Sequence, residues 1–357
     1  HDVDQGTDKG ASIESLLEVF AFDNNITGIY PVQQNQVLCA LQGGRLILLS
    51  SSDLIWEVLL GEDIHAVDVV LEEKMILVGY GHDKLIAMDM KGNRLWETKT
   101  IRIPTLFDSW EYEYPRVVKI RHYIENGTTT ILAGCGDNQL RWYDRNGKLL
   151  NAVYVYATVP DIIEFADIDQ DGELEILAAG AKTSSSGVFR PFKTNGTPGR
   201  NILVGMWLST INSHAIITED KKVLMVCGMN YAKNLKLVSV DKGIGTTVFE
   251  KNLGGTVQTV CFNDDNSIIY AGISKGSVLA FDRSGNHLWQ YSVNDSIKNI
   301  CVFDDQLAVI GKVGNVLVLD QDQHITKQWL LPSVTCFAKA GHNGFIACEN
   351  KLVRLDL

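Results

Sequence analysis

The sequence lacks the long apolar runs and the basic excess that mark two large classes of protein. No stretch approaches the roughly 18 consecutive apolar residues of a transmembrane helix. Lysine and arginine total 32 against 43 aspartate and glutamate residues, a net charge of −11. The surface as a whole should therefore repel nucleic acid and anionic membranes, and we expect neither a membrane span nor a nucleic-acid partner.

The seven cysteines lack the pattern of a disulfide framework or a zinc site. Their number is odd, and no two are separated by only two residues. Each stands where a sister segment of the chain has a small apolar residue. We therefore interpret all seven as buried free thiols that pack as small apolar side chains. Long helical patterns are also few, and 45% of the residues are apolar, which allows a large β-sheet core.

A repeated unit of two strands and their turns accounts for most of the chain. In the copy Ile268–Trp289, an apolar run ends in a turn, and a second run ends at an Asp that precedes a Gly-containing turn and a Trp. The unit occurs eight times, at intervals that match the roughly 40 to 50 residues of a four-stranded propeller blade. The residues that close the second strands are Ser50, Asp89, Asp144, Phe192, Ser239, Asp282, Asp320 and Asp356. Tryptophans recur just after the second turn, as side chains docked between neighbouring sheets would: Trp56, Trp96, Trp289 and Trp329.

The first and last strands of the chain are predicted to belong to one blade. The eighth copy has only its inner three strands when the chain ends at Leu357. After a polar tail over residues 1–12, the chain begins with an unpartnered strand, Leu16–Phe22. Placing that strand outside the last blade closes the ring and removes its free edges. The sequence thus predicts an all-β, eight-bladed β-propeller as a single domain over residues 13–357. Seven blades is the alternative, if the irregular fourth and fifth copies share strands.

Departures from the repeat are concentrated in copies three to five. They include the aromatic insertion Arg102–Arg116, a widened turn at Lys182–Gly187 and Pro191 within a strand. In a four-stranded meander, the turns between second and third strands and the connections between blades emerge on one face. Candidate ligand-binding residues on that face are His65, His82, Trp110, Tyr112, Arg116, Lys182, Trp207, Asn230, Tyr231, Lys233, Lys275 and Lys312. Cations beside aromatics suit an acidic sugar or another anionic ligand, whereas turn lysines that only keep the surface solvated are the alternative.

The acidic loop Asp167–Glu175, DIDQDGELE, is expected on the opposite face. It has carboxylates at its first, third, fifth and ninth positions and a Gly at the sixth, which permits a sharp turn. Calcium prefers six to eight such oxygen ligands. We predict a structural Ca²⁺ whose ligands are Asp167, Asp169, Asp171, Glu175 and the carbonyl oxygen of Glu173. A plain acidic hairpin is the alternative.

Two family resemblances rest on these residues. The phrase strand-Asp-x-x-Gly-x-x-x-Trp, as in AMDMKGNRLW and AFDRSGNHLW, resembles the PQQ-like repeat of quinoprotein-type propellers and covers nearly the whole chain. The loop DIDQDGELE resembles the calcium loop of FG-GAP and VCBS propeller repeats and covers one blade. Quinoprotein dehydrogenases have a longer chain and a pair of adjacent cysteines, and this sequence has no such pair. The resemblance therefore implies a fold, and we expect no bound PQQ.

Two function classes follow. The first is a non-catalytic binding or scaffold propeller, expected as a monomer, that presents its loop face to a glycan or a protein. The second is a polysaccharide lyase acting on a glycan that contains uronic acid, since several lyase families use propellers. A lyase needs a cation to neutralise the uronate and a His or Tyr to move protons. By residue type alone, these roles fit His82, Tyr112, Arg116, Lys182, His214 and Tyr231.

Two features of the sequence point to different cellular compartments. A calcium loop of modest affinity suits millimolar external calcium, whereas unpaired thiols are typical of a reducing compartment. Because the thiols are expected to be buried, we predict an extracytoplasmic protein, either secreted or periplasmic. No signal peptide is visible, and the chain starts at His1 and not at Met, which we interpret as a processed or trimmed N-terminus.

Overall fold

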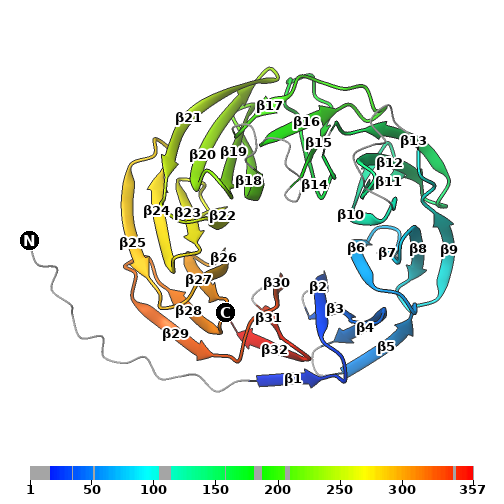
Figure 1. Cartoon of the computed structure of the whole chain (residues 1–357), viewed down its shortest axis with the longest axis horizontal. Helices are drawn as coiled ribbons and strands as arrows, with labels where there is room; N and C mark the ends of the chain where they lie inside the picture. Colours follow the sequence, from blue (N-terminus) through cyan, green and yellow to red (C-terminus); the bar gives the residue numbers. More distant parts are fainter. Residues whose placement is uncertain are drawn as a thin grey trace, which may run out of the picture.

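The computed structural model describes residues 17–33, 35–50, 53–103, 114–156, 158–180, 187–205, 210–340 and 343–356. These residues form eight four-stranded antiparallel sheets, which stand as blades around a common axis in Figure 1. The eight-bladed β-propeller predicted from the sequence is confirmed. The seven-bladed alternative is wrong, because the fourth and fifth copies each form a sheet of their own.

Seven blades take their four strands in chain order, from the inner strand beside the axis to the outer strand at the rim. Blade 1 contains β2 (Ile26–Gln33), β3 (Gln36–Leu41), β4 (Arg45–Ser50) and β5 (Asp53–Leu59), and blade 2 contains β6 (Ile64–Val70), β7 (Met75–Tyr80), β8 (Lys84–Asp89) and β9 (Arg94–Lys99). Blade 3 contains β10 (Val117–Glu125), β11 (Thr128–Cys135), β12 (Gln139–Asp144) and β13 (Leu149–Tyr154), and blade 4 contains β14 (Ile162–Ala166), β15 (Glu175–Ala179), β16 (Val188–Phe192) and β17 (Ile202–Leu203).

The second half of the ring repeats this order. Blade 5 contains β18 (Ile211–Glu219), β19 (Lys222–Met229), β20 (Asn234–Asp241) and β21 (Ile244–Asn252), and blade 6 contains β22 (Val257–Phe262), β23 (Ile268–Ile273), β24 (Ser277–Asp282) and β25 (His287–Ser292). Blade 7 contains β26 (Ile297–Phe303), β27 (Gln306–Gly311), β28 (Asn315–Leu319) and β29 (Ile325–Leu330). Blade 8 contains β30 (Cys336–Ala340), β31 (Asn343–Cys348) and β32 (Lys351–Asp356), and its outer strand is β1 (Leu17–Ala21).

The ring closes as the sequence predicts. Strand β1 pairs antiparallel with β32, with Ala21 opposite Lys351 and Leu17 opposite Arg354. The first and last strands of the chain therefore share one sheet, which removes an exposed edge. Within the described part of the chain, no helix is long and apolar enough to cross a membrane.

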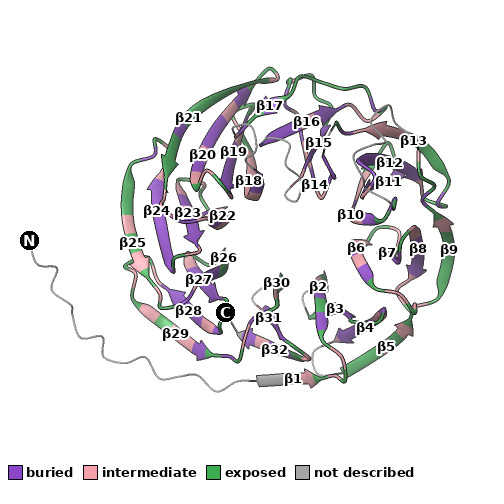
Figure 2. Ribbon diagram, viewed as in Figure 1, coloured by how far each residue is buried: buried purple, intermediate pink, exposed green. Residues whose placement is uncertain are grey.

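Apolar side chains fill the space between blades. Figure 2 shows the middle strands of the blades as mostly buried and the outer strands as mostly exposed or intermediate. Strand β7 is buried at all six positions, whereas the outer strand β5 is exposed at five of seven. The hydrophobic clusters join residues of neighbouring blades, so the ring has no single central core.

The Asp of the repeated phrase closes the turn between the third and fourth strands. In blade 2, the Asp89 Oδ1 atom accepts the backbone N–H groups of Lys91 and Asn93, both at 2.8 Å. Gly92 lies in the same turn with a φ angle of +82°, a conformation that suits glycine. Asp144 and Asp282 make the same pair of hydrogen bonds in blades 3 and 6.

The Trp of the repeated phrase docks onto the following blade. The Trp56 indole N–H donates to the Met90 carbonyl oxygen at 2.9 Å, and the Trp96 N–H donates to that of Arg145 at 2.8 Å. The turn glycine leaves room for the ring, because a Cβ atom at Gly92 would lie 3.1 Å from the Trp56 ring. The predicted docking of these tryptophans between sheets is confirmed.

A glycine near the end of the second strand makes room for the next blade. A Cβ atom at Gly272 would lie 2.5 Å from the Ile297 side chain, and one at Gly228 would lie 2.5 Å from Val257. Ile297 and Val257 are the first residues of the following inner strands. The small residue found in the sequence repeat is thus a point where adjacent blades approach closely.

The cysteines agree in part with the prediction. All seven are free; four are buried (Cys39, Cys135, Cys227 and Cys348) and three are half-buried (Cys261, Cys301 and Cys336). Burial raises the pKa of the Cys39 thiol to about 12 and that of Cys301 to about 11. The thiols are therefore protonated at neutral pH and pack as apolar groups.

Candidate functional site

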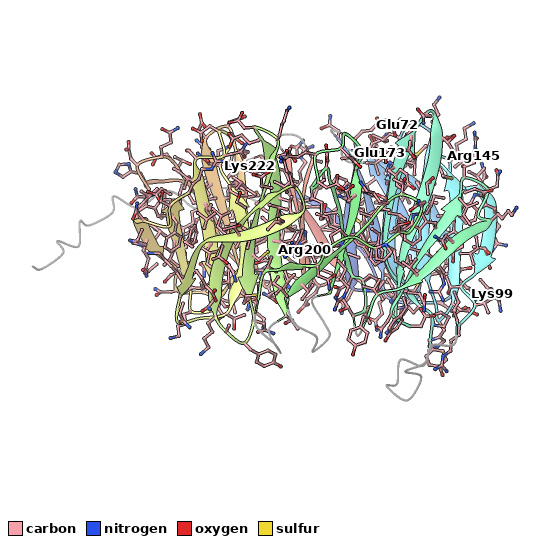
Figure 3. The ribbon with its side chains drawn as sticks, turned by 90° about the horizontal axis from the view of Figure 1, so that it is seen from above. Glu72, Lys99, Arg145, Glu173, Arg200 and Lys222 are labelled. Atoms are coloured by element: carbon pink, nitrogen blue, oxygen red, sulfur yellow. The ribbon has the colours of Figure 1, made fainter. Side chains whose placement is uncertain are left out.

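The ring presents two faces with different turns. In Figure 3, Glu72, Arg145, Glu173 and Lys222 lie toward one face, and Lys99 lies toward the other. We call the side of Lys99 the loop face, since it carries the connections between blades and the turns between second and third strands. The other side, with the turns that join the first to the second and the third to the fourth strands, is the hairpin face. The acidic loop lies on the hairpin face, as predicted.

Three of the predicted residues come together where blades 2 and 3 meet. The His82 ring lies against that of Tyr114, with centroids 4.6 Å apart. Burial lowers the pKa of His65 most, and the nearby charge of Arg116 lowers it further. His82 has a smaller effect in the same direction. A half-buried imidazole and an exposed guanidinium thus share this part of the loop face.

A buried ion pair anchors the chain on both sides of the insertion. Arg141 of β12 donates to Asp137 at 2.8 and 2.5 Å, and its Nη2 also donates to the Ile101 carbonyl oxygen at 2.9 Å. The Thr100 hydroxyl donates to the Pro115 carbonyl oxygen at 2.6 Å. Sequence reasoning missed Arg141; its signal is a lone arginine within the apolar strand QLRWYD.

The other predicted residues lie in blades 5 to 7. Asn230, Tyr231 and Lys233 belong to the turn between β19 and β20, Lys275 to that between β23 and β24, and Lys312 follows β27. All are exposed except the half-buried Asn230, and Tyr231 keeps 75% of its surface exposed. No contact between described residues joins this group to His82. Trp110, Tyr112, Lys182 and Trp207 lie outside the described residues.

The inner strands of blades 2 to 5 carry a chain of ionic contacts that sequence reasoning largely missed. The His122 Nδ1 atom of β10 lies 2.7 Å from an Asp68 oxygen of β6. The adjacent Arg121 points the other way and donates to Glu164 of β14 at 3.0 Å. His214 of β18, which had been predicted only by residue type, lies 3.2 Å from Glu164. These five side chains keep between 17 and 38% of their surface exposed, so solvent reaches the inner wall.

The charges along this wall affect the ionisation of Glu164. Burial raises the pKa of Glu164, but the hydrogen bond from His214 and the charges of Arg121 and Lys119 outweigh it. The net result is a pKa below the usual value. Burial, followed by repulsion from Arg121, lowers the pKa of Lys119. Glu164 is therefore an ionised bridge between blades 3 and 5 at neutral pH.

The acidic loop is tightly folded. The Asp167 carboxylate accepts the backbone N–H groups of Gln170 at 2.7 Å and Gly172 at 3.0 Å. Gly172 has a φ angle of +91°, as expected for the sharp turn. Glu175 is only 2% exposed, and its Oε2 atom accepts the N–H of Ile168 at 2.8 Å.

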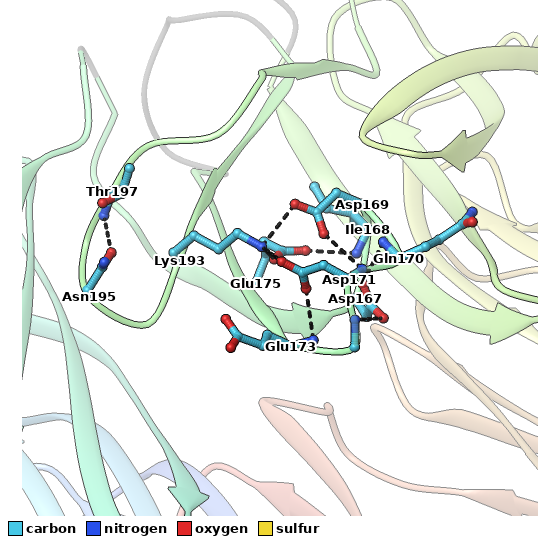
Figure 4. Close-up of polar contacts among 11 residues, drawn as sticks. Asp167, Ile168, Asp169, Gln170, Asp171, Glu173, Glu175, Lys193, Asn195 and Thr197 are labelled. Atoms are coloured by element: carbon cyan, nitrogen blue, oxygen red, sulfur yellow. Dashed lines mark hydrogen bonds and ion pairs between the residues drawn. The ribbon is translucent and has the colours of Figure 1, made fainter.

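The Lys193 ammonium group lies among the loop carboxylates. Its Nζ atom lies 2.9 Å from Asp169, 2.5 Å from Asp171 and 2.6 Å from Glu175, as Figure 4 shows. Burial lowers the pKa of Lys193, but the hydrogen bonds that its ammonium group donates to Asp171 and Glu175 outweigh burial, and the net result is a raised pKa. The single positive charge of Lys193 therefore lies among the carboxylates of Asp169, Asp171 and Glu175.

The donor set of the loop fits a calcium ion. Oxygen atoms of Asp167, Asp169 and Glu175 all lie within 4.8 Å of one another. Ligand oxygens that surround Ca²⁺ at about 2.3 to 2.6 Å have such separations. The Lys193 Nζ atom lies close to two of these carboxylates, Asp169 and Glu175, so a metal ion and this ammonium group would compete for them.

Comparisons with known proteins establish the fold alone. No protein-family model matches the sequence, and no curated protein is a sequence match. BamB from Moraxella catarrhalis is similar in structure, with a TM-score of 0.71 at 16% identity over 96% of this chain and 98% of that chain. Saccharomyces cerevisiae Sqt1 has a TM-score of 0.75 at 14% identity, over 96% and 98% of the two chains. Chaetomium thermophilum Sqt1, bound to the N-terminus of ribosomal protein L10, has a TM-score of 0.74 at 13% identity, over 96% and 100%.

Proposed function

We propose that this protein is a non-catalytic propeller that binds a protein partner on its loop face. The observation that carries the proposal is the set of exposed aromatic and cationic side chains on loop-face turns of blades 2, 3, 5, 6 and 7. Such a set suits a broad contact surface, with aromatic and basic residues as its anchors. The Chaetomium Sqt1 propeller, bound to a segment of another protein, supports this use of the fold.

The charge distribution favours an acidic partner segment. The chain has a net charge of −11, whereas the loop face presents Arg116, Lys233, Lys275 and Lys312 as exposed cations. Complementary charges raise the rate of association and select among partners. A glycan that bears carboxylates is the second type of ligand with this chemistry, and the experiment below distinguishes the two.

The geometry favours binding over lyase chemistry. A lyase needs its base, its acid and its neutralising cation within reach of one sugar residue. His82 and Arg116 share the junction of blades 2 and 3, whereas Tyr231 lies in blade 5, on another side of the axis (Figure 1). The exposed groups are spread as a contact surface would be.

Site-specific cross-linking tests the proposal. A photoreactive phenylalanine analogue placed at Tyr231 or Lys312 should yield a discrete protein adduct in cells of the source organism. The same residue placed at Lys222 or Glu72, on the hairpin face, should yield none. Adducts of equal yield from both faces, or adducts that glycosidase treatment removes, would contradict a protein partner on the loop face.

We also propose that the acidic loop binds a structural Ca²⁺ through Asp167, Asp169, Asp171, Glu175 and the Glu173 carbonyl oxygen. The ion would join β14 to β15 and stabilise blade 4, and the residues themselves take no part in chemistry. A site of this kind suits the millimolar calcium outside the cytoplasm, so we propose an extracytoplasmic location. Calcium-dependent thermal stability tests the site, as set out in the Discussion.

A further inference from the structure

Six inner strands share a register shift at their second residue. The pairing with the neighbouring strand skips one residue in β2, β6, β10, β18, β22 and β26. The six skipped residues form what we call the bulge collar: Thr27, His65, Val118, Asn212, Gln258 and Lys298. A β-bulge leaves one residue unpaired and turns its side chain in a new direction, and bulges are enriched beside binding sites. The collar lies where the inner strands begin, at the loop face.

Three collar residues follow one another around the axis. Asn212, Gln258 and Lys298 belong to β18, β22 and β26, which are the inner strands of consecutive blades (Figure 1). The Asn212 amide donates to the Gln258 Oε1 atom at 3.3 Å and to the Val257 carbonyl oxygen at 2.8 Å. The first two collar side chains are therefore in direct contact.

Lys298 occupies the same position in β26 as Gln258 does in β22. Thr259 follows Gln258, and its hydroxyl donates at 3.3 Å to Asn299, which follows Lys298. This cross-blade contact aligns the two bulges on adjacent inner strands. Asn212, Gln258 and Lys298 thus form a row of equivalent positions on three consecutive inner strands.

Several polar groups of this row have no hydrogen-bond or ion-pair partner among the described residues. Both N–H groups of the Asn212 amide are used, but its Oδ1 atom and the Gln258 NH₂ group have no partner among the described residues, and neither is a sealed-off polar atom. Lys298 is exposed and forms no ion pair within the described part of the chain. Asp295, three residues earlier, is buried and accepts the N–H groups of Val313 and Asn315, so it does not neutralise Lys298.

These groups match the chemistry of an extended peptide. An acceptor beside a donor is the complement of a backbone amide, and an unpaired ammonium group is the complement of a carboxylate. We propose that Asn212, Gln258 and Lys298 bind a carboxylate-bearing extended segment of the partner polypeptide. The inference rests on the proposed function and specifies where the partner's acidic group is held. The carboxylate is either an Asp or Glu side chain or the chain's C-terminus.

Two immobilised libraries of random decapeptides test this inference with the full-length protein. One library ends in a free carboxylate and the other in a carboxamide. Ligands rich in Asp or Glu from the amidated library identify a side-chain carboxylate, whereas enrichment confined to the free-acid library identifies the C-terminus. Either result supports the proposal if Lys298→Met and Gln258→Glu each weaken binding of the selected peptides about tenfold or more.

The variants are chosen to leave the fold intact. Glutamate keeps the oxygen that accepts from Asn212, and it replaces only the NH₂ donor with a group that repels carboxylate. Lys222→Met on the hairpin face is the matched control and should bind as the wild type does.

Three outcomes would overturn the inference: no enrichment from either library, enrichment of peptides without a carboxylate, or unchanged affinity in both collar variants. Each leaves the proposed function standing if cross-linking at Tyr231 still captures a protein. Failure of that cross-linking, in contrast, counts against the proposed function itself.

Discussion

The Lys193 ammonium group lies 2.6 Å from Glu175 Oε1, at the centre of the acidic loop that the sequence predicts to hold calcium. Glu175 is almost fully buried, so its negative charge needs a cation nearby. Two cations, a lysine and a metal ion, are thus candidates for one set of oxygens. Their competition can be measured.

Lys193→Met should make the protein depend on calcium. Without the ammonium group, the loop carboxylates repel one another, so in EDTA the melting temperature should fall by a few degrees relative to wild type. Millimolar CaCl₂ should restore it, and the variant should bind Ca²⁺ more tightly than wild type, because the competing cation is gone. Calorimetric titration and thermal unfolding measure both effects.

Asp169→Ala added to Lys193→Met is the control for this prediction, since it removes a calcium ligand and should abolish the response to CaCl₂. If neither wild type nor Lys193→Met responds to calcium or to chelator, the loop is a lysine-neutralised hairpin and the calcium proposal fails.

Glu164 should make stability depend on pH in the acid range. Its pKa in the folded protein lies below the ordinary value of 4.5. A depressed carboxyl pKa stabilises the fold at pH values above the ordinary value, and this contribution is lost as the pH falls through the folded pKa. Urea unfolding should therefore show Glu164→Gln to be less stable than wild type at pH 7. The difference should begin to shrink below about pH 4.5, where the carboxyl group of the unfolded chain takes up a proton, and should disappear below the lower pKa of the folded protein. A difference that stays constant from pH 7 to pH 3 would contradict the ionic role of Glu164.

Gly272→Ala should strain the contact between blades 6 and 7. The added methyl group would meet the Ile297 side chain at 2.5 Å, and such overpacking costs about 1 to 3 kcal/mol of unfolding free energy. Ile297→Ala in the same chain removes the Cγ2 atom that the methyl group would meet, so the double variant should lose less than the sum of the two single losses. A double-mutant cycle by chemical denaturation measures the coupling. Strictly additive effects would argue against close approach at this position.

Trp56→Phe should cost about 1 kcal/mol beyond the lost apolar area, because it removes the hydrogen bond to the Met90 carbonyl oxygen. Trp289 packs against Tyr270 with ring centroids 5.6 Å apart, and no indole hydrogen bond is found for it among the described residues. Trp289→Phe is therefore the matched control, and it should be less destabilising. Chemical denaturation measures the loss of unfolding free energy in each variant. Equal losses would show that the Trp56 hydrogen bond does not contribute to blade docking.

The eight-bladed ring could be predicted because its recurring residues have local roles. Asp89 closes a turn within five residues, and Gly272 is a small residue within a strand, so both leave a periodic signal. The inner wall could not be predicted in this way. His122 and Asp68 are 54 residues apart and Arg121 and Glu164 are 43 apart, so their pairing depends on how whole blades sit side by side.

The bulge collar and Lys193 were missed for similar reasons. A register shift depends on how two strands pair, and the sequence of β22 alone does not reveal that Gln258 is skipped. Lys193 follows Glu175 by 18 residues, beyond a complete strand, so the loop motif gives no hint of it. His65 was predicted as a loop-face residue, and the structure adds that it is one member of the collar.

The central claim, that the loop face binds an acidic segment of a partner, is tested most directly by the affinity of the cross-linked partner for a charge-reversed loop face. The variant Lys233→Glu, Lys275→Glu, Lys312→Glu should bind at least tenfold more weakly at 0.1 M salt, with a smaller loss at high salt because screening weakens surface charges. The matched variant Lys74→Glu, Lys221→Glu, Lys222→Glu makes the same charge change on the hairpin face and should bind as wild type does. Equal affinities of the two triple variants, measured by calorimetric titration, would contradict the claim.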